Sequence, residues 1–358
     1  MAVTSFKGSK ISMKTRLIAF SMVALAINSL EASTNRLQVV TTTTDLKAIT
    51  EAVGGEYVNV ISISSGKQDP HFIEAKPSYI IKLRKADLFI RIGLQLEIGW
   101  ESLILKGSRN RKIQMGTRGF LDASENIERL EVPTGPVDRS LGDVHTEGNP
   151  HYWLDPYNGR LMAHTITQRL TQLEPEYGPY FEQRQQAFVN SIDVAMFGPD
   201  LLEKFPADTL WKIYTQGNLD EYLKNNKVVL NTQSGWAAQM YFAKGLKIIT
   251  YHKSWTYFLK RFGITAVAQM EPKPGVPPSP KHILQLIQIA NNHNIGIILM
   301  EPFYSDKAPS LVSRKTNAKV LKLGYSVSGD PGTNDYVNLM NNIVNKISAI
   351  LAESTSER

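Results

Sequence analysis

The chain has 358 residues and no cysteine, which excludes disulfides, thiolate metal sites, cysteine nucleophiles and a lipid-modified N-terminal cysteine. Apolar residues make up 42% and charged residues 20%, an ordinary balance for a globular protein that gives no sign of disorder. The formal charge of +7 is scattered among acidic residues without an interleaved basic and aromatic patch, so we expect no nucleic-acid partner.

The N-terminus has the layout of a secretory signal peptide. A short basic region at Met13-Lys14-Thr15-Arg16 precedes an apolar run from Leu17 to Ile27, and polar residues follow. The apolar run is too short to cross a bilayer as a mature helix. Residues 1–33 are therefore predicted to be a leader, with translation starting at Met1 or Met13. The mature protein is predicted to be periplasmic and, without cysteine, not a lipoprotein.

Strand and helix patterns alternate through the first half of the chain, which predicts a parallel sheet covered on both faces. A chain of this length should form two domains, because single cores usually stop growing near about 250 to 300 residues. Strands are predicted at 36–43, 58–62, 88–92 and 112–115, and helices at 44–54, from Pro77 onward and at 97–105.

A polar insert without periodicity separates Asp122 from Gly148, and two helices follow at 158–173 and 176–196. The second of these helices is either a stiff connector between two halves or an ordinary packing helix. The alternation then returns, which predicts a second α/β lobe. Its strands are expected at 246–251, 265–270, 296–300 and 320–323, and its helices at 219–224, 255–262, 281–290, 307–316 and 336–351.

Three histidines lie in similar settings far apart in the sequence. His71 follows Asp69-Pro70, His151 lies between Pro150 and a Tyr-Trp-Leu-Asp-Pro segment, and His252 closes a β-branched apolar run. Proline fixes its own φ and restricts the preceding residue, so these backbones are rigid, as a metal site requires. Any one of these histidines alone is more often a surface or satisfied core residue.

The predicted strands place several candidates at one edge of the sheets. Ligands of open parallel sheets bind beyond the carboxyl ends of the strands. His252 and Glu301 each follow a predicted strand, and His71 lies in the loop after the second strand. Three imidazoles with a carboxylate suit Zn2+ better than Mn2+, which favours more carboxylate, and no all-oxygen shell is offered to Ca2+ or Mg2+.

Four segments resemble the zinc and manganese solute-binding proteins of bacterial ABC transporters, the cluster A-I or TroA-like family. They are Asp69 to Glu74, Asn149 to Pro156, Tyr251 to Phe258 and the stretch around Tyr336. The resemblance implies α/β lobes at 34–173 and 198–358, each with a small parallel sheet flanked by helices, joined by one rigid linker helix over 174–197.

The resemblance also implies a function and a set of ligands. A metal ion, Zn2+ or less readily Mn2+, is expected in the interlobe cleft and is handed to an ABC permease in the inner membrane; a monomer is expected. His71, His151 and His252 match the first three ligands of the family, and a histidine at the third position is similar to the zinc type.

The fourth ligand stays open, because Val327 occupies the position where the family usually has Asp. Glu301 and Asp330 are equally favoured candidates for the fourth ligand, and His145 from the insert is a less favoured one. Glu74 and Asp155 are expected to accept hydrogen bonds from metal-bound imidazoles rather than to bind metal.

Two other functions compete with transport. A zinc-dependent hydrolase would need an open coordination position and a general base, yet the chain has neither a His-Glu-x-x-His helix nor a Gly-x-Ser-x-Gly elbow. We therefore predict that the protein is not an enzyme. A metal-binding adhesin on the same scaffold would have the same site, so the sequence does not separate it from a transport receptor.

Overall fold

The computed structural model of the chain describes Met1 and residues 36–135 and 144–356, with side chains up to residue 352. The residues from Leu37 onward form one compact unit. Apart from Met1, the predicted leader lies outside the described residues, as does the centre of the polar insert.

The first sheet consists of four parallel strands in the order β2-β1-β3-β4. Helix α2 begins after Thr43, whose hydroxyl accepts a hydrogen bond from the backbone N–H of Leu46 at 3.4 Å, and α3 begins with Pro77 at a position where no backbone N–H is needed. The elements of this lobe are β1 (Leu37–Thr41), α2 (Thr44–Gly54), β2 (Val58–Ser62), α3 (Pro77–Arg84), β3 (Leu88–Arg91), α4 (Glu101–Ser108) and β4 (Phe120–Asp122).

The second sheet repeats this topology, with the parallel order β6-β5-β7-β8. Its elements are β5 (Lys247–Thr250), α11 (Thr256–Phe262), β6 (Thr265–Gln269), α12 (Pro280–Asn292), β7 (Ile297–Met300), α13 (Lys307–Lys315) and β8 (Lys319–Lys322). In each sheet the first strand in the chain lies between the second and the third. The strand order therefore reverses direction next to the first strand, between it and the third strand. Ligands of open α/β sheets bind at such reversal points.

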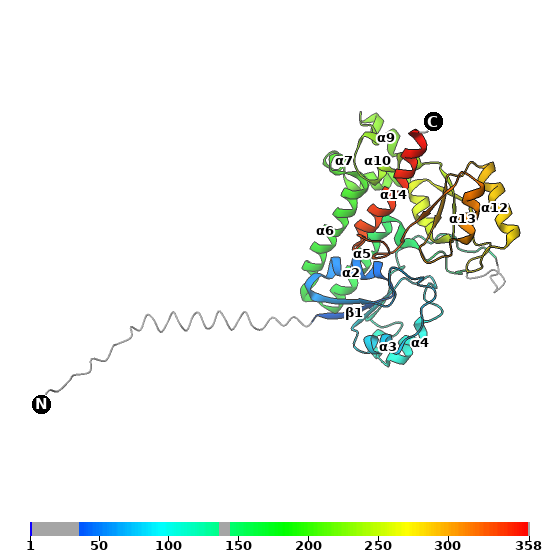
Figure 1. Cartoon of the computed structure of the whole chain (residues 1–358). Coiled ribbons are helices and arrows are strands. Elements are labelled where there is room, and N and C mark those ends of the chain that lie inside the picture. Colours follow the sequence, from blue (N-terminus) through cyan, green and yellow to red (C-terminus); the bar gives the residue numbers. More distant parts are fainter. Residues whose placement is uncertain (2–35, 136–143, 357–358) are drawn as a thin grey trace. The chain divides into compact units, whose positions relative to one another are not determined.

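Long helices lie between the two sheets in sequence and pack side by side in space (Figure 1). Helix α6 (Gly178–Phe197) has 20 residues, which corresponds to about 30 Å, and packs along α5 (Pro156–Leu173). The last helix, α14 (Tyr336–Ser356), returns to contact α2 and α6. Between α6 and the second sheet lie the short helices α7 (Pro199–Lys204), α8 (Ala207–Thr215), α9 (Leu219–Asn225) and α10 (Trp236–Gln239).

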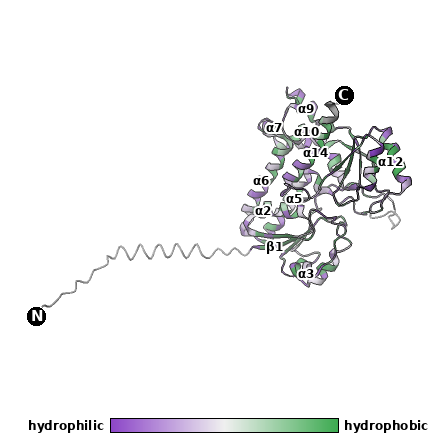
Figure 2. Ribbon diagram, in the orientation of Figure 1, coloured by the Kyte–Doolittle hydropathy of each residue, from purple (hydrophilic) through white to green (hydrophobic). Residues whose placement is uncertain are grey.

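The two sheets share one hydrophobic core. Alternate residues of a strand face opposite sides, and Val39 and Val40 of β1 accordingly belong to different buried clusters. In β7, Leu299 belongs to the same cluster as Val39, whereas Ile298 packs into a third cluster beneath α12 and α13. Single helices, such as α12 in Figure 2, carry both apolar and polar residues. This is expected for helices that pack one side against the core and leave the other side to solvent.

The predicted fold class is confirmed: two parallel sheets flanked by helices, with a long helix between them in the chain. The predicted domain boundaries stay predictions. Within the described ranges, no helix is both long and apolar enough to span a bilayer.

The fourth strand of the first lobe was predicted in the wrong place. Residues Arg111–Ile113 form a 3-10 turn, because the Asn110 carboxamide oxygen accepts the backbone N–H of Lys112 at 3.0 Å. The strand lies later, at Phe120–Asp122, where Leu121 is in register with Ile90 of β3. Helix α4 also begins at Glu101 rather than at residue 97.

Candidate metal centre

Three histidines from separate parts of the chain converge at one point. One ring nitrogen from each of His71, His151 and His252 lies within 4.8 Å of the other two, and all three side chains are buried. The ring centroids of His71 and His151 are 5.1 Å apart, and those of His151 and His252 are 5.5 Å apart. Three imidazoles at this spacing could hold a borderline divalent cation.

Two of the histidines are oriented by the same local hydrogen-bond pattern. In Asp69-Pro70-His71 and Asn149-Pro150-His151, the first side chain accepts a hydrogen bond from the backbone N–H of the histidine, at 3.0 and 2.9 Å. The same oxygens lie 2.7 and 2.9 Å from the Nδ1 atoms of the two rings. With Nδ1 engaged, each ring presents Nε2 to the centre of the site. The Nε2 atom of His151 is buried and has no hydrogen-bond partner among the described residues.

The third histidine is fixed by a carboxylate. His252 Nδ1 lies 2.7 Å from Glu271 Oε2, and both side chains are buried. Glu271 follows β6, and its Oε2 also accepts the backbone N–H of Gly275 at 3.1 Å. Imidazoles that bind metals usually donate their second N–H to such an acceptor, which fixes the tautomer and the ring orientation. Each of the three rings thus has its own acceptor.

The fold explains why these segments meet. His252 follows β5 and Glu301 follows β7, the two neighbouring strands where the order of the second sheet reverses. The segment that contains His151 is held against the second lobe by Trp153, whose indole N–H donates to the carbonyl oxygen of Tyr325 at 2.8 Å. The hydroxyl of Tyr336 on α14 donates to the carbonyl oxygen of Trp153 at 2.6 Å.

His145, from the polar insert, lies beside this group. Its Nε2 is 3.1 Å from His71 Nε2, and the two rings stack with centroids 5.1 Å apart. It is not among the three residues whose ring nitrogens all lie within the 4.8 Å limit. The structure thus brings His145 to the edge of the site next to one of its members.

Glu301 is fully buried but is not one of these three residues. Its carboxylate oxygens have no hydrogen-bond partner of good geometry in the described part of the chain. Burial raises the pKa of Glu301 to about 8, and the nearby Ser254 hydroxyl offsets only part of this effect. A buried carboxyl without partners is costly, so a bound cation nearby would stabilise its ionised form.

The other candidate residues lie elsewhere. Asp330 accepts hydrogen bonds from Asn342 at 2.8 Å and from the Lys346 ammonium at 3.0 Å, both on α14. The side chain of Glu74 is 85% exposed. Asp155 caps α5 and forms an ion pair with Arg261 at 2.7 Å. The acceptors of the imidazoles are therefore Asp69, Asn149 and Glu271, not Glu74 and Asp155.

The electrostatics of the site favour the neutral forms of His151 and His145. Burial, followed by the positive charges of neighbouring histidines, lowers the pKa of His151 well below its ordinary value and that of His145 to about 3. Burial alone would raise the pKa of Asp69, but its hydrogen bond to His71 and the charge of that ring outweigh burial and lower it. Neutral rings can bind a cation without first releasing a proton.

Comparison with known proteins identifies the family. A family model described as "Zinc-uptake complex component A periplasmic" matches residues 39–195 and 212–350, well over half of the chain.

The chain belongs to this ZnuA family.

Solved structures share the fold of this chain. The structure resembles the "Crystal structure of ZnuA" with a TM-score of 0.64 at 21% identity, over 88% of this chain and 99% of that one. A Mn-bound periplasmic metal binding protein from candidatus liberibacter asiaticus has a TM-score of 0.61 at 20% identity, over 88% of this chain and all of its own. At these identities the likeness concerns the fold alone.

Curated relatives carry the names of several metals. The iron-binding protein YfeA of Yersinia pestis is 23% identical over 92% of this chain and 93% of its own length. The manganese ABC transporter substrate-binding lipoprotein scaA of Streptococcus gordonii is 23% identical over 94% of this chain and 97% of its own. The chain is thus a metal-binding substrate-binding protein of an ABC transporter, and such proteins deliver their cargo to a membrane permease. Members of the ZnuA family are solute-binding receptors, which confirms the prediction that the chain is not an enzyme.

The predicted localisation needs correction. We predicted a periplasmic protein that cannot be a lipoprotein because the chain has no cysteine. This is wrong, because a relative that aligns with 94% of the chain is named a lipoprotein. The missing cysteine therefore does not decide how the protein is retained. A location outside the cytoplasm fits both the family description and the names of the relatives.

Proposed function

We propose that the protein captures Zn2+ between its two lobes and delivers it to the permease of an ABC transporter. The observation that supports this most strongly is the convergence of His71, His151 and His252 within 4.8 Å of one another. Each ring has a separate acceptor on Nδ1, which leaves three Nε2 atoms for one cation. The proposed receptor acts as a monomer.

The donor set supports zinc over the metals named for several relatives. Three imidazoles match the nitrogen ligands that Zn2+ prefers, whereas Mn2+ favours sites richer in carboxylate. At a given nitrogen site, affinity rises from Mn2+ through Fe2+ towards Zn2+. Zn2+ is therefore the cargo that binds most tightly among these three ions.

We propose His145 as the fourth ligand. Two imidazole nitrogens bound to one tetrahedral zinc, each at about 2.0 to 2.1 Å, lie about 3.3 Å apart. The Nε2 atoms of His71 and His145 are 3.1 Å apart, close to this value. Glu301 is the alternative, because its buried oxygens have no partner. Asp330 is disfavoured by its contacts with Lys346 and Asn342.

Metal titrations of single-alanine variants test the proposal. Calorimetry with a competing chelator should give one Zn2+ per chain and weaker binding of Mn2+. His151→Ala and His252→Ala should each weaken Zn2+ binding by at least a hundredfold. The matched control is His293→Ala, because His293 is exposed at the end of α12. Unchanged binding in the first two variants, or an equal loss in the control, would contradict the proposal.

The fourth ligand and the cargo have separate tests. His145→Ala should weaken Zn2+ binding while Asp330→Asn leaves it unchanged; the opposite ranking would exclude His145. In cells that depend on this transporter, His151→Ala should abolish growth on limiting zinc, and added zinc should restore it. Growth of that variant at the normal rate without added zinc would argue against delivery of zinc.

A further inference from the structure

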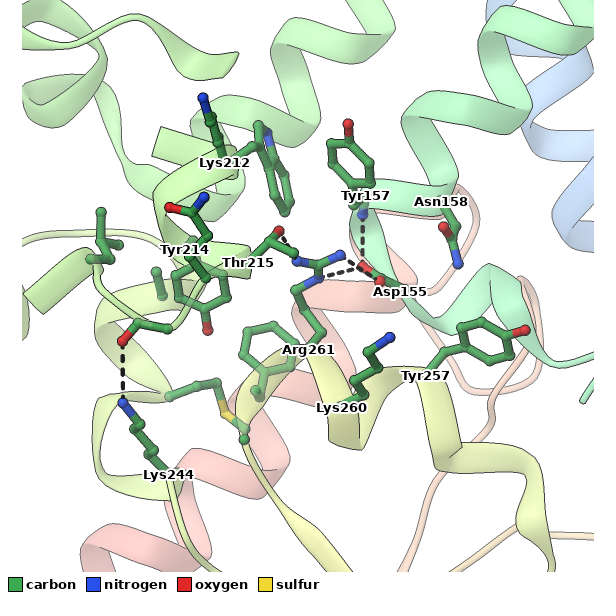
Figure 3. A pocket seen from close by; sticks show the side chains of 18 of the residues that line it. Asp155, Tyr157, Asn158, Lys212, Tyr214, Thr215, Lys244, Tyr257, Lys260 and Arg261 are labelled. Atoms are coloured by element: carbon green, nitrogen blue, oxygen red, sulfur yellow. Dashed lines mark hydrogen bonds and ion pairs between the residues drawn. The ribbon is translucent and has the colours of Figure 1, made fainter. Parts of the chain in front are cut away.

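A cavity of about 630 Å3 is lined by none of the three histidines; Figure 3 shows it from close by. It is bordered by the start of α5, by α8 and by α11, and we call it the aromatic cavity. Its volume falls in the range of about 300 to 1,000 Å3 that is typical of small-molecule sites. The residues that matter for the argument are Tyr157, Trp211, Tyr214, Met240, Tyr257 and Arg261.

One wall of the cavity is rigid. The guanidinium of Arg261 lies 5.5 Å from the ring centre of Tyr157 and 5.4 Å from that of Trp211. It also donates two hydrogen bonds of 2.7 Å to the carboxylate of Asp155 and one of 2.8 Å to the hydroxyl of Thr215. Cation–π contacts and a bidentate ion pair fix this side chain, so the wall is formed before any ligand binds.

Four acidic and four basic side chains line the cavity, so their formal charges balance, but the acidic and basic groups differ in how they are paired. All four acidic side chains are in ion pairs: Glu128 with Lys260, Asp155 with Arg261, Asp208 with Arg160, and Asp220 with Lys224.

Two lining lysines have no acidic partner among the residues that the structure describes. Lys212 has no ion pair in the described part of the chain, and Lys244 makes only a 3.5 Å contact with the carbonyl oxygen of Gly217. Within the described part of the chain, no carboxylate engages these two ammonium groups, so they can pair with an anionic ligand.

A polar atom is also available inside. The hydroxyl of Tyr214 points into the open space of the cavity (Figure 3), and no hydrogen bond joins it to another described residue. Buried Met240 provides an apolar surface in the same space. The lining thus offers a hydrogen-bond donor and two cations beside an apolar surface.

The cavity is distinct from the metal site that the family shares. Trp211 and Asp208 lie between residues 195 and 212, a segment that the family model does not match. The metal-binding histidines all lie within the matched residues. The cavity is therefore built in part by a segment outside the family pattern.

We propose that the aromatic cavity binds a small organic anion with an apolar body. The carboxylate, sulfonate or phosphate group of such a ligand interacts with Lys212 and Lys244 and accepts a hydrogen bond from Tyr214. Its apolar body packs against Met240 and the aromatic wall. This inference does not depend on which metal the protein carries.

Fluorescence titration of the full chain with 1-anilinonaphthalene-8-sulfonate tests the proposal. The probe should bind with one saturable site per chain. The double variant Lys212→Glu and Lys244→Glu should weaken binding at least tenfold, and Gln216→Trp, which fills the mouth from an exposed position, should abolish it. N-phenyl-1-naphthylamine, which lacks the sulfonate, should bind more weakly and be insensitive to the lysine changes.

The control is the double variant Lys281→Glu and Lys315→Glu, which makes the same charge change at exposed positions outside the cavity. It should bind the probe normally. Equal loss in both double variants, or no loss in the first, would overturn the proposal.

Methyl NMR of the unaltered protein covers the case in which a variant fails to fold. The probe should shift the resonance of Met240 and leave those of Met270 and Met300, which lie in the core of the second lobe, in place. No shift of Met240 would refute the inference.

Discussion

Replacing Glu271 with alanine removes the acceptor that fixes the ring of His252. The two atoms concerned, His252 Nδ1 and Glu271 Oε2, lie 2.7 Å apart and both side chains are buried, so water does not readily take the place of the carboxylate. Loss of such an acceptor usually weakens metal binding about 10- to 100-fold. This corresponds to roughly 1.4 to 2.8 kcal/mol of binding free energy. We expect Glu271→Ala to weaken Zn2+ binding within this range.

The assay is a zinc titration in the presence of a competing chelator. Glu271→Gln keeps an acceptor oxygen and should lose less affinity than the alanine variant. Glu74→Ala is the matched control, because its carboxylate is 85% exposed and touches none of the three rings. The reasoning is refuted if Glu271→Ala binds zinc as tightly as the unaltered protein, or if Glu74→Ala loses as much affinity.

Three further predictions concern stability. Burial raises the pKa of Asp45 to about 7, so in the metal-free protein its contribution to stability falls as pH rises from about 4 to 7. Asp45→Asn keeps an acceptor for the backbone N–H of Val327 and should gain up to roughly 4 kcal/mol at pH 8 but only about 1.5 kcal/mol at pH 5, measured by urea unfolding. Arg261→Ala leaves Asp155 buried without its partner and should lose about 3 to 5 kcal/mol, whereas a loss below about 1 kcal/mol would contradict a buried ion pair. Zinc at a thousandfold excess over Kd should add about 4 kcal/mol to the free energy of unfolding, and His151→Ala should remove this gain.

Most of the fold could be predicted because each element is marked locally. Pro77 and Pro280 each occupy the first position of a helix, and the buried strands read as short apolar runs. The fourth strand was misplaced because a propensity pattern does not reveal that the Asn110 side chain caps a turn over Arg111–Ile113. In a three-residue strand such as Phe120–Asp122, pairing with β3 decides the structure, and pairing partners are distant in the sequence.

The histidines could be found from sequence, whereas their acceptors were missed. Asp69 and Asn149 were detectable, because both occupy the first position of an Asx-Pro-His pattern and side chains of this type bond the backbone two residues later. Glu271 was not, because it lies 19 residues after His252 and meets it only when β5 and β6 pair. The fourth ligand depends on loop geometry that no local pattern specifies.

X-ray absorption at the zinc edge of the metal-loaded protein tests the central claim most directly. We predict one zinc ion per chain, with at least three imidazole nitrogens at about 2.0 Å in the first coordination shell. A shell of oxygen atoms with fewer than three imidazoles, unchanged in His151→Ala, would contradict the convergence of the three histidines on a single cation.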